Sequence, residues 1–187
     1  MSSDLKKISD LQAIFGSGEF LYPKKASIFN GFNQVLGIHV AFLAEAAATC
    51  INNKNRIYDG AFVDVGANYG IISRAVSHSP WFKTVDAYEC NPVIFDTLQK
   101  NLNASTSDKI INCYNVAISN ENKKINFHVP EDVNVHGDLT LFGDRNSDIV
   151  HEIEAVTLDD IYFGKKVIDL LKIDVEGFEI DVLEGAK

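Results

Sequence analysis

The hydrophobic positions in the first part of the chain recur at helical spacing. In residues 4–15, leucine, isoleucine and phenylalanine return every three or four positions, which places them on one face of a helix. A Gly-Ser-Gly sequence at 16–18 interrupts this pattern. Residues 35–51 are then apolar over most of their surface and rich in alanine, which favours helix. We therefore expect residues 1–55 to form an N-terminal helical segment that acts as a lid or packs over a sheet.

In the rest of the chain, short apolar runs alternate with amphipathic segments. The runs predict strands, and the segments between them predict helices. One of these helices begins at Asn91-Pro92, a capping asparagine followed by a proline at the first helical position. Such an alternation predicts a parallel sheet with right-handed crossovers. The predicted strands are 61–65, 84–89, 110–119 and 167–175. The predicted helices are 71–77, the segment after Asn91 with Phe95, Leu98 and Leu102 on one side, and 178–186, which Glu176-Gly177 opens.

One segment departs from the alternation of strands and helices. Residues 124–129 and 151–157 alternate between apolar and polar positions, as strands with one buried face do, and we expect them to pair antiparallel. A polar loop joins them. A capping box that begins at Thr157 then predicts a short helix that ends near Phe163.

The last predicted strand, 167–175, is apolar on both faces, which suits a strand with a neighbour on each side. As the final strand it would lie near an edge of the sheet, where an apolar strand is prone to aggregate. We therefore expect either a C-terminally truncated domain or an edge that another subunit or residues 124–157 cover. The predicted fold class is α/β, a Rossmann-like, doubly wound, mostly parallel sheet in residues 56–187 that N-terminal helices precede.

Composition narrows the class of protein. The 187 residues carry a net charge of −9, which argues against binding to the phosphate backbone of a nucleic acid. The chain has no apolar run of about 18 residues, and residues 1–10 lack the apolar core of a signal peptide, so we expect a cytoplasmic protein without a membrane partner. The three cysteines include no C-x-x-C pair and the five histidines no i,i+4 pair, so we predict no metal site.

The first strand of the alternating region runs into a glycine-containing loop, VDVGANYG, at 63–70. A sharp turn from strand to helix needs residues that tolerate positive φ, and Gly66, Asn68 and Gly70 meet this need. The small side chains would let a ligand approach the backbone. Free N–H groups at the start of the next helix would bind a pyrophosphate or a carboxylate. The glycine spacing is not the G-x-G-x-x-G of dinucleotide-binding loops.

Three acidic residues at predicted strand ends narrow the choice of ligand. Asp64, beside the loop, would repel a phosphate but attract an ammonium or a sulfonium group. S-adenosylmethionine carries both cations and a carboxylate, and Glu89 stands at the end of the second strand, where a ribose needs an acidic partner. Asp174 ends the fourth parallel strand, which faces the same crevice as the first strand in a doubly wound sheet. The three carboxylates are therefore expected to converge.

Each of these features has another explanation on its own. The loop would fit any tight strand–helix turn, and Glu89 could end its strand in solvent. Asp174 and Glu176 could simply stabilise the start of the next helix. Their order and spacing together favour a ligand site.

The chain also contains, in this order, the segments VDVGANYGIISR, YECNPVIFDTLQKNL, NVAIS, VTLDDI and LLKIDVEGFEIDVLEGA. Together they resemble the FkbM-type methyltransferase domain, a branch of the class I S-adenosylmethionine-dependent enzymes. The resemblance covers about residues 58–187, and the family domain continues beyond the final helix with further strands. Family members commonly methylate hydroxyl groups on sugars, glycans or natural products, so the resemblance implies a small-molecule or glycan hydroxyl acceptor.

The resemblance also implies positions around S-adenosylmethionine for residues at the ends of the predicted strands. These are the methionine end for Asp64, Gly66, Asn68 and Gly70, the ribose hydroxyls for Glu89, the adenine for Cys90, Asn91, Asn115, Val116 and Ala117, and the methyl group with its acceptor for Asp174 and Glu176.

The expected reaction is an in-line transfer of the methyl group from the sulfonium to an acceptor oxygen. A base that takes the hydroxyl proton would assist it. Asp174 is the first candidate by its strand position, and His136 in the polar loop is the second. Two other functions stay open, a non-catalytic cofactor-binding or interaction module and a nicotinamide-dependent oxidoreductase, although the loop fits a pyrophosphate poorly. The sequence also leaves open whether the chain forms a homo-oligomer.

Overall fold

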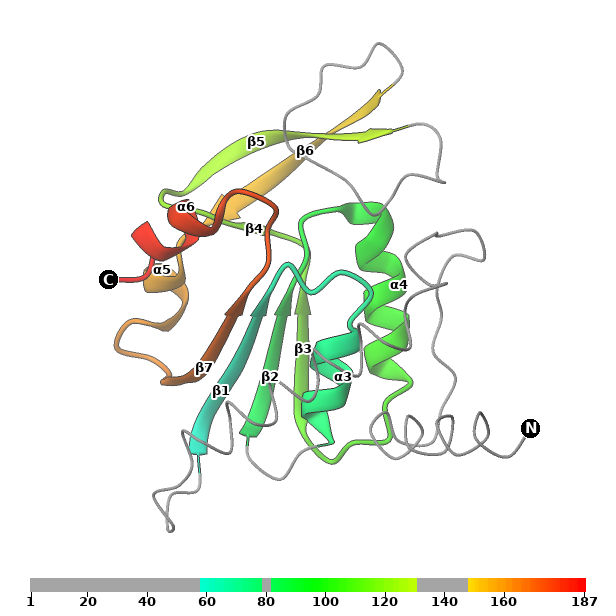
Figure 1. Ribbon diagram of the computed structural model, residues 1–187, viewed down its shortest axis with the longest axis vertical. Helices are drawn as coiled ribbons and strands as arrows, with labels where there is room; N and C mark the ends of the chain where they lie inside the picture. The colour runs from blue at the N-terminus through cyan, green and yellow to red at the C-terminus, as the bar shows by residue number, and fades with distance from the viewer. Residues whose placement is uncertain (1–57, 79–81, 131–147) are drawn as a thin grey trace, which may run out of the picture.

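The computed structural model describes residues 58–78, 82–130 and 148–187, which form an α/β unit with two sheets (Figure 1). The predicted N-terminal helical segment at 1–55 and most of the predicted polar loop lie outside these residues. Within the described ranges, no helix is long and apolar enough to cross a membrane.

The main sheet has four parallel strands in the order β3-β2-β1-β7, and their carboxyl ends meet at one edge (Figure 1). Helices connect its first three strands, as predicted for a parallel sheet with crossovers. The elements are β1 (Tyr58–Val65), α3 (Ile71–Ser77), β2 (Phe82–Tyr88), α4 (Pro92–Asn103), β3 (Ile110–Tyr114) and β7 (Ile168–Ile173).

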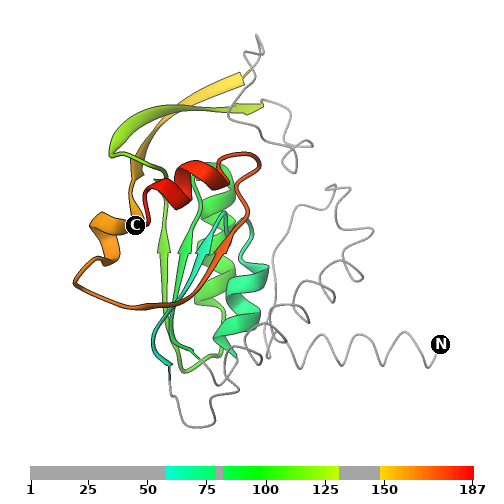
Figure 2. The ribbon, with the colours of Figure 1, turned by 60° about the vertical axis from the view of Figure 1, so that its left-hand side comes forward.

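Helices cover both faces of the main sheet. On one face, Phe62 and Val85 pack with residues of α3, and Leu98 and Leu102 of α4 pack against Ala87. The opposite face is covered by α5 (Leu158–Tyr162) and α6 (Glu179–Glu184), which contribute to a second buried cluster with β1. Figure 2 shows α5 on the opposite side of the sheet from α3 and α4. The predicted α/β, Rossmann-like and doubly wound class is therefore confirmed.

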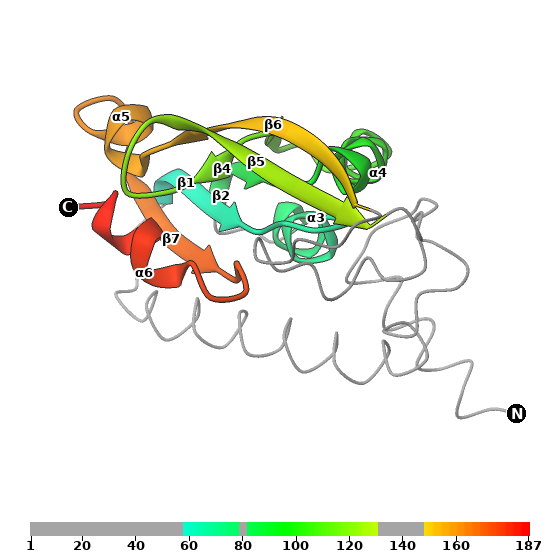
Figure 3. The ribbon, with the colours of Figure 1, turned by 90° about the horizontal axis from the view of Figure 1, so that it is seen from above.

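The segment that departs from the alternation forms its own small sheet, in the order β4-β6-β5. Its two long strands are β5 (Lys123–Pro130) and β6 (Asp148–Val156), which pair antiparallel as predicted. Phe127 and Ile153 are buried on the inner face of this pair and pack with Cys90. Figures 1 and 3 show the small sheet over the carboxyl edge of the main sheet.

The predicted strand at 110–119 is wrong in its extent. Only β3 belongs to the main sheet, and β4 (Ala117–Ile118) pairs with β6 in the small sheet. The break occurs at Asn115, whose side-chain amide donates to the carbonyl oxygens of Glu89 (2.8 Å) and Cys90 (3.1 Å). Because a side chain makes these hydrogen bonds, the backbone is released from the main sheet and turns toward the small one.

In the described part of the chain, the main sheet ends at β7, which pairs with β1 on one side. All six of its residues are half-buried. The suggestion that residues 124–157 cover this edge is wrong for the described part of that segment, because residues 124–130 and 148–156 build the small sheet instead. Residues 131–147 lie outside the described residues. The suggestions of a truncated domain and of a covering subunit stay predictions.

Candidate functional site

The loop between β1 and α3 is a tight turn with three residues at positive φ, as predicted. Gly66, Asn68 and Gly70 have φ values of 74°, 53° and 85°. The loop is fixed to β2 because the N–H groups of Gly66 and Ala67 both donate to the carbonyl oxygen of Tyr88, at 3.0 and 2.9 Å. Residues 66–70 are called the β1 loop below.

Both glycines of the β1 loop are needed for packing within the protein. A Cβ on Gly66 would overlap the carbonyl oxygen of Asp174, and a Cβ on Gly70 would lie 2.6 Å from Cδ1 of Leu98. The expectation that these positions leave room for a ligand is therefore wrong on the side where a Cβ would stand. There the end of β7 and the face of α4 fill the space.

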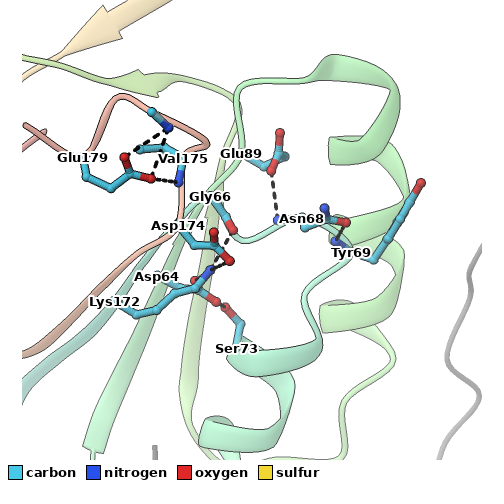
Figure 4. Close-up of polar contacts among 11 residues, drawn as sticks. Asp64, Gly66, Asn68, Tyr69, Ser73, Glu89, Lys172, Asp174, Val175 and Glu179 are labelled. Atoms are coloured by element: carbon cyan, nitrogen blue, oxygen red, sulfur yellow. Dashed lines mark hydrogen bonds and ion pairs between the residues drawn. The ribbon is translucent and has the colours of Figure 1, made fainter. Parts of the chain in front are cut away.

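Asp64 lies beneath the β1 loop and has no exposed surface. Its carboxylate is 2.9 Å from Nζ of Lys172 and accepts a hydrogen bond of 2.7 Å from Oγ of Ser73 (Figure 4). We expected Asp64 to attract a cation of the ligand, but a lysine of the same chain already neutralises it. The expectation that the charge of Asp64 attracts a cation of the ligand is therefore corrected, because Lys172 already pairs with it. A contact between Asp64 and a cofactor stays a prediction.

Lys172 is absent from the predicted site residues, although the structure places it between several of them. Its Nζ donates to the carbonyl oxygen of Gly66 at 2.8 Å and lies 3.9 Å from Oδ2 of Asp174. The signal in the sequence is a single lysine within the apolar run LLKI, two positions before Asp174 and therefore on the same face of the strand. Only the strand register reveals its partner, because Asp64 and Lys172 are direct neighbours in β1 and β7.

Glu89 follows β2, as predicted for a residue at the end of the second strand. Its two carboxylate oxygens accept hydrogen bonds from the N–H groups of Asn68 (2.9 Å) and Asn91 (2.8 Å), so it joins the β1 loop to the start of α4. Burial raises the pKa of the Glu89 carboxyl, and the two N–H groups oppose this rise by stabilising the carboxylate. Glu89 is therefore held firmly and is easier to protonate than an exposed glutamate.

The residues predicted to lie beside the adenine gather around Glu89. Cys90 lies under the small sheet, and burial, together with the charge of Glu89, raises the pKa of its thiol to about 12. Asn91 caps α4 with its side-chain oxygen. Its Nδ2 is buried and has no hydrogen-bond partner in the described part of the chain. Asn115 binds the backbone of Glu89 and Cys90, and Val116 and Ala117 lead from it into the small sheet.

A second loop leaves the end of β7. Residues 174–178, called the β7 loop below, begin with Asp174, whose N–H donates to the carbonyl oxygen of Val65 at 3.0 Å and whose side chain is 70% exposed. Glu176 is exposed and has a φ of 51°. The helix predicted at 178–186, which Glu176-Gly177 opens, is confirmed with slightly shorter bounds, since α6 runs from Glu179 to Glu184.

Glu179 is a second residue of the site that is absent from the predictions. Its carboxylate accepts hydrogen bonds from the N–H groups of Val175 (3.2 Å) and Gly177 (3.1 and 3.3 Å), as Figure 4 shows. The backbone N–H group of Glu179 itself and those of Gly177 and Val175 lower the pKa of the carboxyl. A carboxylate that follows a glycine by two residues near a helix start is a local signal for such a contact.

The structure thus brings together the predicted carboxylates at one edge of the sheet. Lys172 bridges Asp64 to the region of Asp174, and Asn68 links the β1 loop to Glu89. His136, the second candidate base, lies outside the described residues. Among the described residues, no group of three histidine, cysteine or acidic side chains is placed to hold a metal ion.

The chain is similar in structure to several methyltransferases. The crystal structure of methyltransferase FkbM from Methylobacillus flagellatus KT is similar to 99% of this chain at 18% identity, with a TM-score of 0.48, and the chain spans 45% of that protein. TYW2 from P. horikoshii in complex with MeSAdo is similar over 42% of this chain and 42% of its own, at 20% identity and a TM-score of 0.29. A putative RNA methyltransferase from Pyrococcus horikoshii covers 59% of this chain and 50% of its own, at 19% identity and a TM-score of 0.32.

No curated protein sequence matches the chain. A family profile for the methyltransferase FkbM domain matches residues 64–187, which is more than half of the chain and includes both the β1 loop and the β7 loop. The chain therefore belongs to the methyltransferase FkbM domain family.

Proposed function

We propose that the chain binds S-adenosylmethionine at the carboxyl edge of the main sheet and transfers its methyl group to a hydroxyl oxygen. The observation that carries this proposal is the position of Glu89. Its carboxylate follows β2 and is fixed by the N–H groups of Asn68 and Asn91, beside the loop that follows β1. An acidic residue at this point of a Rossmann-like sheet is suited to accept the hydroxyl hydrogens of a ribose.

The surrounding groups fit the cofactor on independent grounds. Asn91 has a buried Nδ2 without a partner in the described residues, a donor that an adenine nitrogen would satisfy. The β1 loop is fixed to β2 and β7 by backbone and lysine hydrogen bonds, so it offers a rigid surface to the methionine end. When bound, S-adenosylmethionine supplies an electrophilic methyl group, and the remaining task of the protein is to orient the reactants.

Asp174 is the proposed general base. Its carboxylate is exposed at the end of β7, on the side of the sheet edge that holds the β1 loop. A carboxylate oxygen there would accept the proton of an acceptor hydroxyl as the oxygen attacks. Glu176 of the same loop would line the acceptor side. His136 stays the second candidate base.

The proposed acceptor is a hydroxyl of a sugar, a glycan or a natural product, as the resemblance implies. A net charge of −9 supports an acceptor other than a nucleic acid. We also propose that the protein works in the cytoplasm without a membrane partner.

Titration calorimetry of the purified chain with S-adenosylhomocysteine and with NAD tests the cofactor assignment. We expect S-adenosylhomocysteine to bind and NAD not to bind, and Glu89→Ala to lose most of the affinity because the ribose loses its acceptor. Asp96→Asn, on the exposed side of α4, is the matched acidic control and should bind as the wild type does. Binding of NAD alone would support an oxidoreductase instead, and no binding of either ligand would contradict the proposal.

Transfer of a radioactive methyl group to hydroxyl-bearing acceptors tests the reaction. Asp174→Ala should abolish turnover while S-adenosylhomocysteine still binds. Turnover near that of the wild type would show that the base is assigned wrongly. Tight binding of S-adenosylhomocysteine without methyl transfer to any hydroxyl acceptor would favour a non-catalytic cofactor-binding module.

A further inference from the structure

We propose that Lys172 is a positioning residue that fixes the methionine end of the cofactor site to the strand that carries Asp174. The inference rests on the proposed function and adds a residue to it. Its basis is a single side chain that contacts β1, the β1 loop and the region of Asp174 together. Nζ of Lys172 lies 2.9 Å from Oδ1 of Asp64 and 3.9 Å from Oδ2 of Asp174, and it donates to the carbonyl oxygen of Gly66 at 2.8 Å.

The first role of Lys172 is to make the buried Asp64 tolerable. A carboxylate without exposed surface is costly unless a cation and hydrogen bonds compensate it, and Lys172 with Ser73 provides both. The side chain of Lys172 is itself only 17% exposed, so water competes little for its ammonium group. Removing Lys172 alone would leave an unpaired charge in the core, beneath the β1 loop.

The second role is geometric. The peptide group that follows Gly66 is held on one side by the carbonyl oxygen of Tyr88, which accepts the N–H of Ala67, and on the other by Lys172, which binds the Gly66 carbonyl oxygen. The start of the β1 loop is therefore clamped between β2 and β7. Since β7 continues directly into Asp174, the same lysine couples the loop to the proposed base.

The two ends of the cofactor depend on different anchors. Glu89, the proposed ribose ligand, is held by hydrogen bonds from Asn68 and Asn91. The charge of Lys172 lowers the pKa of Glu89, but the hydrogen bonds of Lys172 go to the Gly66 carbonyl oxygen and not to Glu89. A loss of Lys172 should therefore weaken a ligand that includes the methionine portion more than one that lacks it. Adenosine and S-adenosylhomocysteine differ in that portion, so they separate positioning from a general loss of structure.

The experiment compares the wild type, Lys172→Met and the double variant Asp64→Asn/Lys172→Met by calorimetry with both ligands. Lys172→Met should weaken S-adenosylhomocysteine by at least about tenfold, because a charged hydrogen bond is lost, and adenosine by less than about threefold. The double variant removes both charges of the pair, that of Asp64 and that of Lys172. It should regain thermal stability but not the affinity for S-adenosylhomocysteine, since the Gly66 carbonyl oxygen still lacks its donor.

Several results would overturn the inference. Affinities for both ligands that fall equally would show a merely structural role, and unchanged affinity for S-adenosylhomocysteine in either variant would remove the positioning role. If Lys172→Met fails to fold, the double variant decides, and wild-type affinity there overturns the inference. Failure of the wild type to bind either ligand would overturn the proposed function as well, whereas the other outcomes leave the proposed function standing.

Discussion

The β1 loop and the β7 loop use the same device at neighbouring strand ends. Each follows a parallel strand and contains a non-glycine residue at left-handed φ, Asn68 at 53° and Glu176 at 51°. In each, a glutamate carboxylate accepts from the backbone of the loop (Figure 4): Glu89 from the N–H group of Asn68 in the β1 loop, and Glu179 from the N–H groups of Val175 and Gly177 in the β7 loop. In the described part of the chain these are the two non-glycine residues with positive φ.

The two loops differ in where the restraining carboxylate comes from. Glu89 belongs to another strand end and is buried, and burial raises its pKa. Glu179 comes from the residues just after its loop, and the backbone N–H groups lower its pKa. The carboxylate that restrains the β1 loop thus comes from tertiary packing, whereas the carboxylate that restrains the β7 loop comes from the adjacent sequence. The β7 loop contacts the sheet through its first residue, Asp174, whose N–H donates to Val65. The β1 loop should therefore depend more strongly on the whole sheet than the rest of the β7 loop does.

The largest expected effect comes from the glycines of the two loops. Gly66→Ala should destabilise the fold by about 3 kcal/mol or more, because the new Cβ overlaps the Asp174 carbonyl oxygen. Gly177→Ala should cost only about 1–2 kcal/mol of backbone strain, since no atom of the described residues, apart from its own chain neighbours, lies within 4 Å of its Cβ position. Urea unfolding measures both values, and equal costs would contradict the difference between the loops.

The next effect concerns the two carboxylates. Glu89→Ala leaves the N–H groups of Asn68 and Asn91 without their acceptor in a buried place, which should cost about 1–3 kcal/mol and most of the cofactor affinity. Glu179→Ala should change stability less, because water can replace its carboxylate at an exposed loop. Hydrogen exchange of the two loops should show local opening in each variant. Opening of the β1 loop in Glu179→Ala would show that the loops are not independent.

The pH dependence should have opposite signs for the two glutamates. The folded state binds the Glu89 proton more tightly than the unfolded state does, so the Glu89 contribution to stability improves as the pH falls through its raised pKa. The lowered pKa of Glu179 gives the reverse, a contribution that is present above its ordinary pKa and is lost as the pH falls through its folded pKa.

Cofactor affinity follows the ionised form of Glu89, because the carboxylate accepts the ribose hydroxyls. We expect the affinity for S-adenosylhomocysteine to fall as the pH is lowered through the raised pKa of Glu89, at a higher pH than an exposed glutamate would give, in the wild type and in Glu179→Gln. Glu89→Gln should bind weakly and without this pH dependence. An unchanged pH profile in Glu89→Gln would assign the titration to another group.

The smallest expected effect is that of the Glu176 charge on the reactivity of the Cys90 thiol. The pKa of the Cys90 thiol is raised to about 12 by burial, and the charges of Glu89 and Glu176 add to the rise. Iodoacetamide at about pH 8 should therefore modify Cys90 at least about a hundredfold more slowly than an unfolded thiol, as peptide mass spectrometry can measure. Glu176→Gln should speed the reaction slightly and Asp96→Asn should not. Equal rates in the folded and unfolded protein would contradict the raised pKa of the half-buried Cys90.

Much of the local structure could be predicted from the sequence. The helix at Ile71–Ser77 has the predicted bounds, and Asn91 caps α4 as expected, since its side-chain oxygen accepts from Val93 and Ile94. The capping box at Thr157 is half right. Its hydroxyl accepts from Asp160, but its own N–H donates to Asn122 instead. Short-range patterns succeed here because the partners are a few residues apart.

The errors occur where a distant partner decides. The strand at 110–119 breaks because Asn115 finds backbone acceptors at the end of another strand, which no periodicity reveals. The charge of Asp64 is cancelled by Lys172, from a strand that is distant in the sequence.

The sequence by itself determined the order of strands and helices, the turn at VDVGANYG and the acidic residues at the strand ends, because periodicity, glycine and capping residues act within a few positions. The tertiary structure alone decided that the Asp174 carbonyl oxygen occupies the place where a Cβ on Gly66 would stand, that Lys172 neutralises Asp64, and that Glu89 is buried. These features depend on strand register, which brings residues together across about a hundred positions of chain and sets the local dielectric that no short pattern encodes.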